Sequence, residues 1–405
     1  MKPIVRAGRM KPVHSDIRGP LFVEAMKRQK QGIDILKLNT GNPATFGFGL
    51  PDSIKNALLE HMQDGVGYCD FKGMPQARQA ICDYETSKGI KGITSDDVFI
   101  GNGVSEVVSF ALTPLLNDGD EVLVPSPSYS LWGNSVYLED GKPVFYTCDE
   151  QANWYPDIQD IRSKITDKTK AIVIINPNNP TGVLYPKELL LEIIQIARES
   201  GLLIFADEIY DRLVMDGKQH ISLASLTEDV PVITLNGLSK SHCLCGYRCG
   251  WMVISGPREL TEDYRQGIIQ LTSLRLCANT MAQIVIPAAL DDMETPASMV
   301  RPGGRIYEQR EATVRELEKI DGLSFVKNDA AFYVFPKLDV KKFNITNDKQ
   351  FAHDLLDVTN ILLVPGSGFD WKDPDHFRIV MLPQADILSD AIRRMGTFLD
   401  GYKQK

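Results

Sequence analysis

The stretch AIVIINPNNPTG, residues 171–182, joins a run of apolar, mostly β-branched residues to a loop of asparagine, proline and glycine. A short apolar run bounded by a turn signal is typical of a buried strand. Two X-Pro steps stiffen the loop, so Asn179 is held close to the end of the strand, although a plain tight turn has the same pattern. The stretch predicts a core strand with polar side chains at its carboxyl end.

The same pattern recurs along the middle of the chain, usually followed by helix-like sequence. Further examples are DVFIGNGVSE (97–106), EVLVPSPSYS (121–130), LLIFADEIY (202–210) and VITLNGLSK (232–240), and CGWMVISGP (249–257) looks like one more strand. Apolar strands alternating with helices predict an α/β fold, with a buried, mostly parallel sheet covered by helices on both faces. Because ligands bind beyond the carboxyl ends of such strands, we expect the five polar strand ends to share one pocket.

The rest of the chain predicts a second, smaller α+β domain. Helices are expected at 20–32 and 304–320, and strands at 330–338, 361–369 and 376–382. We expect residues 1–45 to form an N-terminal arm and part of the small domain, residues 46–288 the large domain, and residues 289–405 the small C-terminal domain.

Composition limits the partners. The 405 residues carry a net charge of −9, with a pI near 5.3, so binding to nucleic acid or to an anionic membrane is not expected. The N-terminus has basic residues but no apolar core, unlike a signal peptide, and no apolar run approaches the roughly 20 residues of a membrane span. Seven cysteines without paired spacing are expected to be reduced thiols. We therefore expect a soluble cytoplasmic protein.

Residues 101–106, GNGVSE, lie between a predicted strand and a predicted helix. Backbone amides at such a turn, here those of Val104 and Ser105, are suited to a phosphate group. A dinucleotide loop would require G-x-G-x-x-G and an acidic residue at the end of the next strand, whereas this chain has G-x-G-x-x-E and Glu121 at the beginning of that strand. Taken alone, the turn could also be purely structural.

Asp207 ends the buried run LLIFA, where a carboxylate is costly unless a cation or a donor meets it. A helix N-cap is the alternative role. Tyr210 follows three residues later and would lie on the same side of a helical turn.

Lys240 and Arg248 follow the last parallel strand. A lysine at this position is usually a solvated surface residue, but in a partly buried pocket it can act as a nucleophile or base. Arg248 offers a planar fork for phosphate or carboxylate. With the phosphate-binding turn, Asn179, Asp207, Tyr210 and the aromatic Tyr129, these residues are the set that pyridoxal phosphate requires.

A zinc site is the rival interpretation of LSKSHCLCGYRCG, residues 238–250, since His242, Cys243, Cys245 and Cys249 lie within eight positions. Structural zinc sites generally draw ligand pairs from separate segments, and no second Cys/His cluster is present in this sequence. Small buried cysteines that fill space are commoner, so no metal is expected.

The chain resembles the class I/II aminotransferases, which are pyridoxal-phosphate enzymes of fold type I, over nearly its whole length. The resemblance rests on NPNNPTG, DEIY and SK-x7-R in that order and spacing. SDIRGP (15–20), LNTGNPATFGF (38–48), YCDFKGMPQAR (68–78) and SLRLCAN (273–279) look like the bacterial alanine aminotransferases of the glutamate–pyruvate type. The resemblance implies a seven-stranded, mostly parallel sheet in a cofactor-binding large domain, and a homodimer with active sites at the subunit interface.

The resemblance also implies a role for each matching residue. Lys240 would bind the cofactor aldehyde and move the substrate proton. Asp207 would keep the ring nitrogen protonated, and Asn179 and Tyr210 would donate to the phenolic oxygen. Tyr129 would stack on the ring. The phosphate would be held by Val104, Ser105, Ser239, Arg248 and, from the neighbouring subunit, Tyr68.

For the substrate, the resemblance implies that Arg378 and Asn179 bind the α-carboxylate end and that Gly41 leaves room and closes over it. Arg18 would receive a distal carboxylate or seal the pocket, or else pair with a surface acid. The expected reaction moves an amino group between L-alanine and 2-oxoglutarate by a ping-pong route. The close relatives are expected to have an aromatic residue just before Asp16, where this chain has His14 and Ser15.

Several alternatives stay open from the sequence. Within the same cofactor class they are an aspartate or aromatic aminotransferase and a carbon–sulfur β-lyase. An NAD-dependent oxidoreductase leaves Lys240, Asp207 and Asn179 unexplained. A regulator with an aminotransferase-like domain would need an added basic DNA-binding module, for which this chain has neither the length nor the charge.

Overall fold

The strand predicted from residues 171–175 is β6 (Thr169–Ile175) of the computed structural model, which describes residues 2–405. It lies inside the largest sheet, whose strands in spatial order are β2 (Val98–Asn102), β9 (Cys249–Ser255), β8 (Val232–Gly237), β7 (Leu203–Asp207), β6, β3 (Glu121–Ser126), β4 (Lys142–Asp149) and β5 (Tyr155–Pro156). β8, β7, β6, β3 and β4 run parallel to one another.

The α/β class and the strands predicted for the large sheet are confirmed, but this sheet has eight strands, not seven. β9 is antiparallel to both of its neighbours, and the two-residue β5 adds antiparallel to β4 at the edge. β4 is not among the predicted strands, because it continues from Asp149 into Glu150 and Gln151 without the loop of Gly, Pro, Asn or Ser that ends the others.

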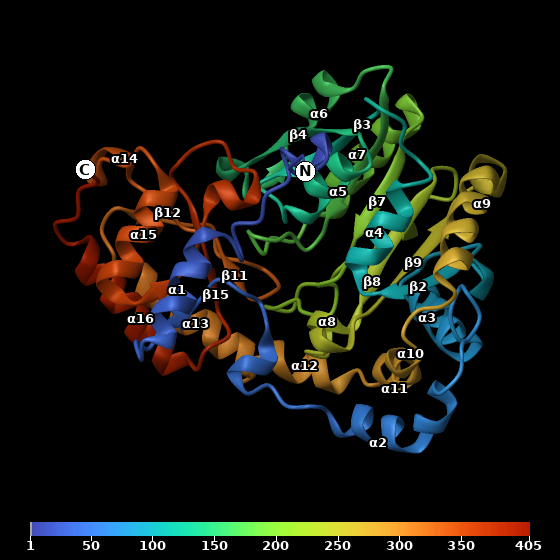
Figure 1. The fold of residues 1–405 in the computed structure, drawn as a ribbon, viewed down its shortest axis with the longest axis horizontal. Helices are drawn as coiled ribbons and strands as arrows, with labels where there is room; N and C mark the ends of the chain where they lie inside the picture. Colours follow the sequence, from blue (N-terminus) through green and yellow to red (C-terminus); the bar gives the residue numbers. More distant parts are fainter. Residues whose placement is uncertain (1) are drawn as a thin grey trace.

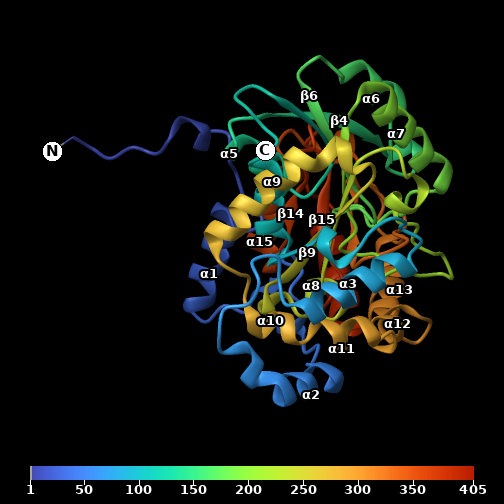
Figure 2. The same cartoon turned by 90° about the vertical axis from the view of Figure 1, so that its right-hand side faces the viewer.

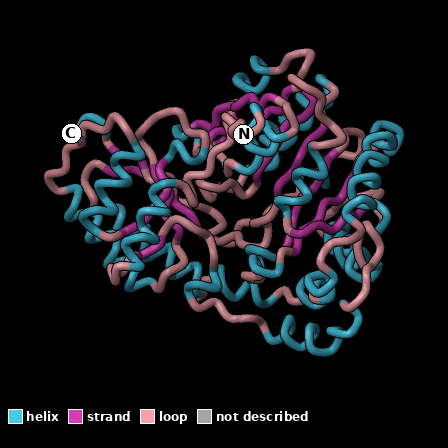
Figure 3. The backbone as a smooth tube through the Cα atoms, in the orientation of Figure 1, coloured by secondary structure: helices cyan, strands magenta, loops and turns pink. Residues whose placement is uncertain are grey.

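Helices cover both faces of this sheet (Figures 1 and 3). The side chains of β6 alternate accordingly: Ile172 and Ile174 pack on the face covered by α7, while Ala171, Val173 and Ile175 pack on the face covered by α4 and α5. The helices of this part are α2 (Asp52–His61), α3 (Pro75–Ser87), α4 (Val104–Leu112), α5 (Leu131–Leu138), α6 (Ile158–Lys164), α7 (Lys187–Ser200), α8 (Leu238–Ser241), α9 (Arg258–Arg275), α10 (Thr280–Ile284) and α11 (Ile286–Asp291).

The second part contains three small sheets. β11 (Tyr333–Val334), β15 (Phe377–Val380) and β14 (Val364–Pro365) form one, β1 (Leu36–Lys37) pairs with β13 (Ile361–Leu362), and β10 (Leu323–Ser324) pairs with β12 (Lys337–Leu338). Its helices are α1 (Pro20–Lys30), α12 (Glu294–Val300), α13 (Arg305–Leu317), α14 (Val340–Phe343), α15 (Asp348–Thr359) and α16 (Ala385–Leu399). Because β1 pairs with β13, the N-terminal segment adds to the C-terminal part, which supports the domain division that we propose at residues 45 and 288.

The first residues of the described chain extend away from both parts (Figure 2), and Ile4 and Val5 are fully or largely exposed. In the described residues no single helix is long and apolar enough to cross a membrane. Only the pair α9 and Thr280–Asp291, bent by 118° at its break, meets the length and composition requirements together.

Candidate active site

The carboxyl ends of the parallel strands meet between the two parts of the molecule, as expected for an open α/β sheet. β3 ends at Ser126, β6 at Ile175, β7 at Asp207 and β8 at Gly237. The small part contributes Arg378 from β15. The segment after β1 contributes Gly41, whose carbonyl oxygen lies 3.2 Å from Lys240 Nζ.

Asp207 is a buried carboxylate at the end of β7. Its Oδ2 accepts a hydrogen bond from the Trp132 indole at 3.0 Å, and its Oδ1 accepts a long one from the Ile209 amide at 3.4 Å. Burial raises the pKa of Asp207 to about 6, while the Trp132 bond opposes that shift. Asp207 forms no ion pair among the described residues, so its carboxylate is available to a cationic ligand group.

The turn that follows Asp207 is held by ion pairs to Lys88 at the end of α3. The Lys88 ammonium lies 2.7 Å from Glu208, 3.1 Å from Asp211 and 2.8 Å from Glu85. Glu208 and Asp211 form, with His220, the one group of three described residues with spacing suited to a metal ion. Since the ammonium already contacts both carboxylates, this cluster holds the turn in place.

Lys240 is half-buried in the short helix α8, directly after β8. Its Nζ donates to the Gly41 carbonyl and lies 5.9 Å from the centroid of the Phe332 ring. Gly41 has no room for a side chain, because a Cβ would lie 2.4 Å from the Tyr333 hydroxyl oxygen and 2.9 Å from the Phe332 ring.

Arg378 is fully buried, and burial lowers its pKa. One guanidinium nitrogen donates to Asn179 Oδ1 at 2.9 Å, another donates to the Asn39 carbonyl, and the group lies between the rings of Tyr333 and Phe369 at 4.5 and 4.6 Å. The hydrogen bond from Arg378 to Asn179 Oδ1 orients the Asn179 amide. Its Nδ2 makes no hydrogen bond in the described part of the chain and is free to donate to a ligand.

Tyr210 is buried and its hydroxyl lies 2.8 Å from that of Tyr333. Burial raises the pKa of Tyr210 well above its ordinary value, so the phenol stays protonated. Tyr129 is half-buried in the loop after β3. Like Tyr210, it lies near enough to Arg378 to oppose the effect of burial and raise the pKa of the guanidinium.

Val104 and Ser105 begin α4, where the first backbone amides have no acceptor within the helix. The Arg248 guanidinium lies directly against Gly103, since a Cβ there would be 2.4 Å from its Nη2. Ser239 precedes Lys240 in α8, which follows β8; β9 separates β8 from β2 in the sheet. Glu106, which breaks the dinucleotide pattern, accepts from the Asn102 amide at 2.7 Å and pairs with Arg275 at 2.6 Å, which fixes the turn.

The cysteines near Lys240 contact different neighbours. Cys243 lies against Met299, Cys245 donates to Asn42, Cys249 is buried in β9, and His242 contacts Ser241 and the Asp292 carbonyl. None of these four belongs to a group with metal-ligand spacing in residues 2–405. Burial raises the pKa of Cys243 and of Cys249 to about 12, consistent with apolar filling.

Two expected site residues lie outside this constellation. Tyr68 is 83% exposed. Arg18 is exposed and has no hydrogen-bond or ion-pair partner among residues 2–405, so it does not pair with a surface acid. His14, which with Ser15 stands where close relatives are expected to have an aromatic residue, lies 3.0 Å from Asp370 and 3.6 Å from Asp16.

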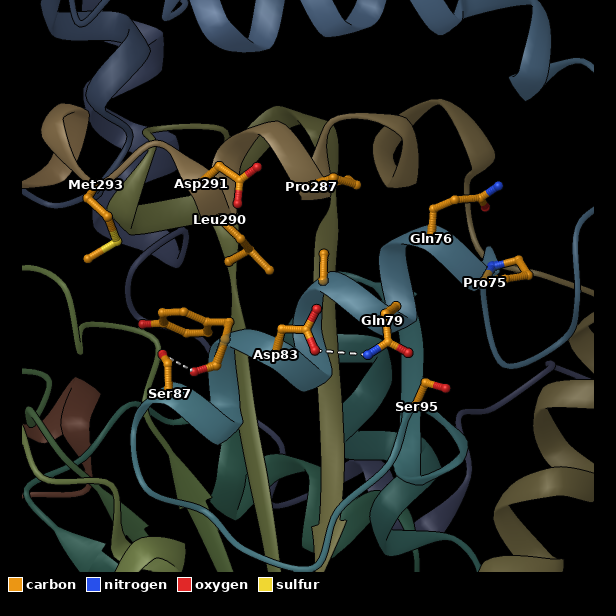
Figure 4. A pocket seen from close by; sticks show the side chains of 12 residues that line it. Pro75, Gln76, Gln79, Asp83, Ser87, Ser95, Pro287, Leu290, Asp291 and Met293 are labelled. Carbon is orange, nitrogen blue, oxygen red and sulfur yellow. Dashed lines mark hydrogen bonds between the residues drawn. The ribbon is translucent and has the colours of Figure 1, made fainter.

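A separate groove of about 820 Å³ lies between α3 and the segment from α11 to Met293, on the outside of the large part (Figure 4). It is lined by residues such as Gln76, Asp83, Pro287 and Leu290, and Gln79 donates to Asp83 within it at 2.8 Å. None of the expected site residues lines it, so it is distinct from the constellation around Lys240.

Four residues of the site carry no clear sequence signal. Trp132 lies three positions after Tyr129, so a helical turn there would have pointed to it. Asn39, Lys88 and Tyr333 are brought in by long-range contacts; Tyr333 and Tyr210 are 123 positions apart.

The fold and this constellation are those of an amino-group transferase. The sequence model of the family "Aminotransferase class I and II" matches residues 33–392. The chain therefore belongs to the class I and II aminotransferases and is a transaminase.

Two curated relatives and one solved structure are similar over their full or nearly full length. The chain is 50% identical over 404 residues to the glutamate-pyruvate aminotransferase AlaA of Haemophilus influenzae, covering 100% of both chains. It is 45% identical to the alanine aminotransferase of Mycobacterium tuberculosis, covering 100% of this chain and 94% of that one. The crystal structure of an aminotransferase from Escherichia coli superposes with a TM-score of 0.98 at 47% identity, covering 100% of both chains.

Proposed function

We propose that this transaminase uses pyridoxal phosphate to move an amino group between L-alanine and 2-oxoglutarate, giving pyruvate and L-glutamate. The observation that carries the cofactor is the arrangement of three side chains: a half-buried amine, Lys240, lies at the same strand ends as the buried carboxylate Asp207 and the buried guanidinium of Arg378. The names of the similar proteins support the substrate pair.

The donor set of the pocket fits pyridoxal phosphate. Asp207 has no cationic partner in the described chain, and a protonated ring nitrogen would supply one. The free Nδ2 of Asn179 and the protonated Tyr210 are both donors, which suits a phenolic oxygen that carries negative charge. The phosphate would be held by the Val104 and Ser105 amides, Ser239 and Arg248, and Tyr129 would stack on the ring.

When bound, the cofactor supplies an aldehyde that accepts the amino group and a ring that withdraws electrons from the substrate Cα. Lys240 is the amine that would hold this aldehyde, and as a free base it would carry the proton of the substrate Cα. Asp207 keeps the proton on the ring nitrogen. Arg378 binds the α-carboxylate and so orients the Cα–H bond toward Lys240.

Arg18 is the candidate ligand for the distal carboxylate of glutamate or 2-oxoglutarate. It is exposed and free of other partners among residues 2–405, and it follows Ile17, whose carbonyl accepts a hydrogen bond from Asn39 at 2.9 Å. Since the Asn39 carbonyl accepts from Arg378, the two arginines are connected through Ile17 and Asn39.

We also propose a homodimer in which Tyr68 completes the partner's phosphate site. Large apolar side chains are exposed on η3 (Met62–Gly65) and its flanks and at the end of α9: Leu59, Met62, Val66, Leu274 and Leu276. These segments are joined by the hydrogen bond from Thr280 to the Gly65 carbonyl. A hollow of about 680 Å³ beside them is lined by Tyr68, Asn102 and Asn279. Exposed apolar surface of this kind indicates an interface.

A reducing cytoplasmic location is supported by the seven free thiols.

Borohydride reduction tests the cofactor. The purified protein should show a visible absorbance band that reduction removes, and peptide mapping should find the cofactor bonded to Lys240. Lys88 is the internal control: its ammonium is paired with Glu85, Glu208 and Asp211, so it should remain unlabelled. A protein without the band, or an adduct on another lysine, would overturn the assignment.

Substrate assays separate the alternatives. Alanine with 2-oxoglutarate should give pyruvate and glutamate at a higher kcat/KM than aspartate or phenylalanine as donors. Faster turnover of aspartate or phenylalanine would make this an aspartate or aromatic aminotransferase. Release of ammonia and pyruvate from a cysteine thioether, without need of a 2-oxo acid, would make it a carbon–sulfur lyase.

A further inference from the structure

Tyr333 is a buried residue of β11 that none of the roles above uses. Its hydroxyl lies 2.8 Å from that of Tyr210, and the two rings meet edge to face at 5.7 Å. Tyr210 comes from the turn after β7, so this bond joins the small part of the molecule to the large one at the active site.

Two phenols at this distance share one proton in their hydrogen bond, and the other proton must point elsewhere. The Tyr333 hydroxyl has no other acceptor among residues 2–405, and Gly41 closes one side of it, since a Cβ there would lie 2.4 Å away. The Arg378 guanidinium lies 4.5 Å from the centre of the Tyr333 ring, and a positive charge beside a phenol favours donation by that phenol.

We propose that Tyr333 is a positioning residue of the active site, which donates its hydrogen bond to Tyr210 and thereby directs the Tyr210 proton toward the phenolic oxygen of the cofactor. This inference rests on the proposed function. Accepting a hydrogen bond also strengthens a hydroxyl as a donor, so Tyr333 makes the bond from Tyr210 stronger.

The test is Tyr333→Phe, which removes one oxygen and keeps the ring beside Arg378. Loss of one hydrogen bond should lower kcat by about 3- to 10-fold and move the pH midpoint of the holoenzyme's visible band upward by about 0.4 to 1 pH unit. KM for alanine should stay the same, because the ring that contacts the guanidinium is retained. Tyr146→Phe is the matched control: this buried hydroxyl donates to the Val173 carbonyl at 2.7 Å inside the sheet, and its loss should leave the midpoint unchanged.

A double-mutant cycle isolates the route through Tyr210. Tyr210→Phe alone should raise the midpoint, and adding Tyr333→Phe should then raise it no further. A further shift in the double variant would overturn the proposal, as would an unchanged midpoint in Tyr333→Phe or a rise in KM with constant kcat. If wild-type protein shows no visible band at all, the proposed function fails instead.

Replacing Tyr333 by 3-fluorotyrosine gives a prediction of opposite sign and does not depend on how the phenylalanine variant folds. The fluorinated phenol is a stronger donor, so the midpoint should move downward. A midpoint that stays unchanged or moves upward would contradict the proposed role of Tyr333.

Discussion

The pKa of Asp207 depends on its burial and on one buried hydrogen bond, from the Trp132 indole. The position of Asp207 after a core strand could be read from the sequence, as could those of Asn179 and Lys240, because each follows an apolar run at a strand end. The indole of Trp132 could not, since its bond to Asp207 spans 75 positions and depends on how α5 packs on the sheet. Residue identity therefore predicts the groups of this site, and tertiary packing sets their hydrogen bonds.

Trp132→Phe should destabilise the cofactor-free protein by about 1–3 kcal/mol at pH 8, because the ionised Asp207 loses its shortest hydrogen bond. Burial raises the pKa of Asp207 to about 6, so this carboxyl favours folding below its unfolded value near 4, and the benefit is lost as pH rises through about 6. The cost of the substitution should accordingly shrink toward pH 4. Urea unfolding at pH 4, 6 and 8 measures it, and in an Asp207→Asn background the pH dependence should vanish. A cost that is equal at all three pH values would contradict this account.

The turn Asp207–Asp211 shows what an element-level pattern leaves out. DEIY indicates where β7 ends, but not that Glu208 and Asp211 point away from the pocket toward Lys88. Burial opposes the charge of Lys88, yet Glu208, Glu85 and Asp211 together raise its pKa well above the ordinary value. The same kind of pattern predicts the strands of the large sheet except β4, which ends at Asp149 without a loop of Gly, Pro, Asn or Ser, and β5, which has only two residues.

Lys88→Met should destabilise the protein by about 3–5 kcal/mol, since it leaves three buried carboxylates without their shared cation. Lys91→Met is the control from the same region: Lys91 and its partner Glu228 are both about two-thirds exposed, so loss of their ion pair should leave stability nearly unchanged. Denaturant unfolding at pH 7.5 compares the two. Equal effects would mean that Lys88 does not hold the turn.

The segment around His14 should loosen as pH rises. Hydrogen bonds to Asp16 and Asp370 raise the pKa of His14 to about 9, and the same contact with His14 lowers the pKa of Asp16, which Lys349 also contacts at 3.2 Å. The charged imidazole thus stabilises this segment fully below its unfolded value near 6.5, and the effect is lost as pH rises through about 9. Tryptic cleavage after Arg18, normalised to a free peptide, should accelerate about two- to fivefold between pH 7.5 and 9.5. His14→Gln should cleave at a rate that does not change over this range; the same acceleration in that variant would exclude His14 as the cause.

At the scale of the whole molecule, the active site draws residues from both parts of the chain. The sequence could predict two domains and a site at the strand ends, because strand–helix alternation and the later mixed pattern are local features. It could not predict that Asn39 and Tyr333 connect to Arg378 and Tyr210, because those contacts exist only once the two parts have packed together. Tyr68 is the remaining expected residue, and its 83% exposure in one chain is consistent with a place in a second chain's site.

Subunit complementation tests that placement. Lys240→Ala homodimers should be inactive and Tyr68→Ala homodimers should be weakly active. A heterodimer of the two, isolated with different affinity tags, combines Lys240 of one subunit with Tyr68 of the other in one intact site, and should recover about half of the wild-type activity per dimer, since a twofold dimer has two equivalent sites. If Tyr68 instead served its own subunit, every site of the heterodimer would lack one of the two residues, and its activity would be no more than about half that of Tyr68→Ala. Sedimentation of the wild-type protein as a monomer at assay concentration would also contradict the shared site.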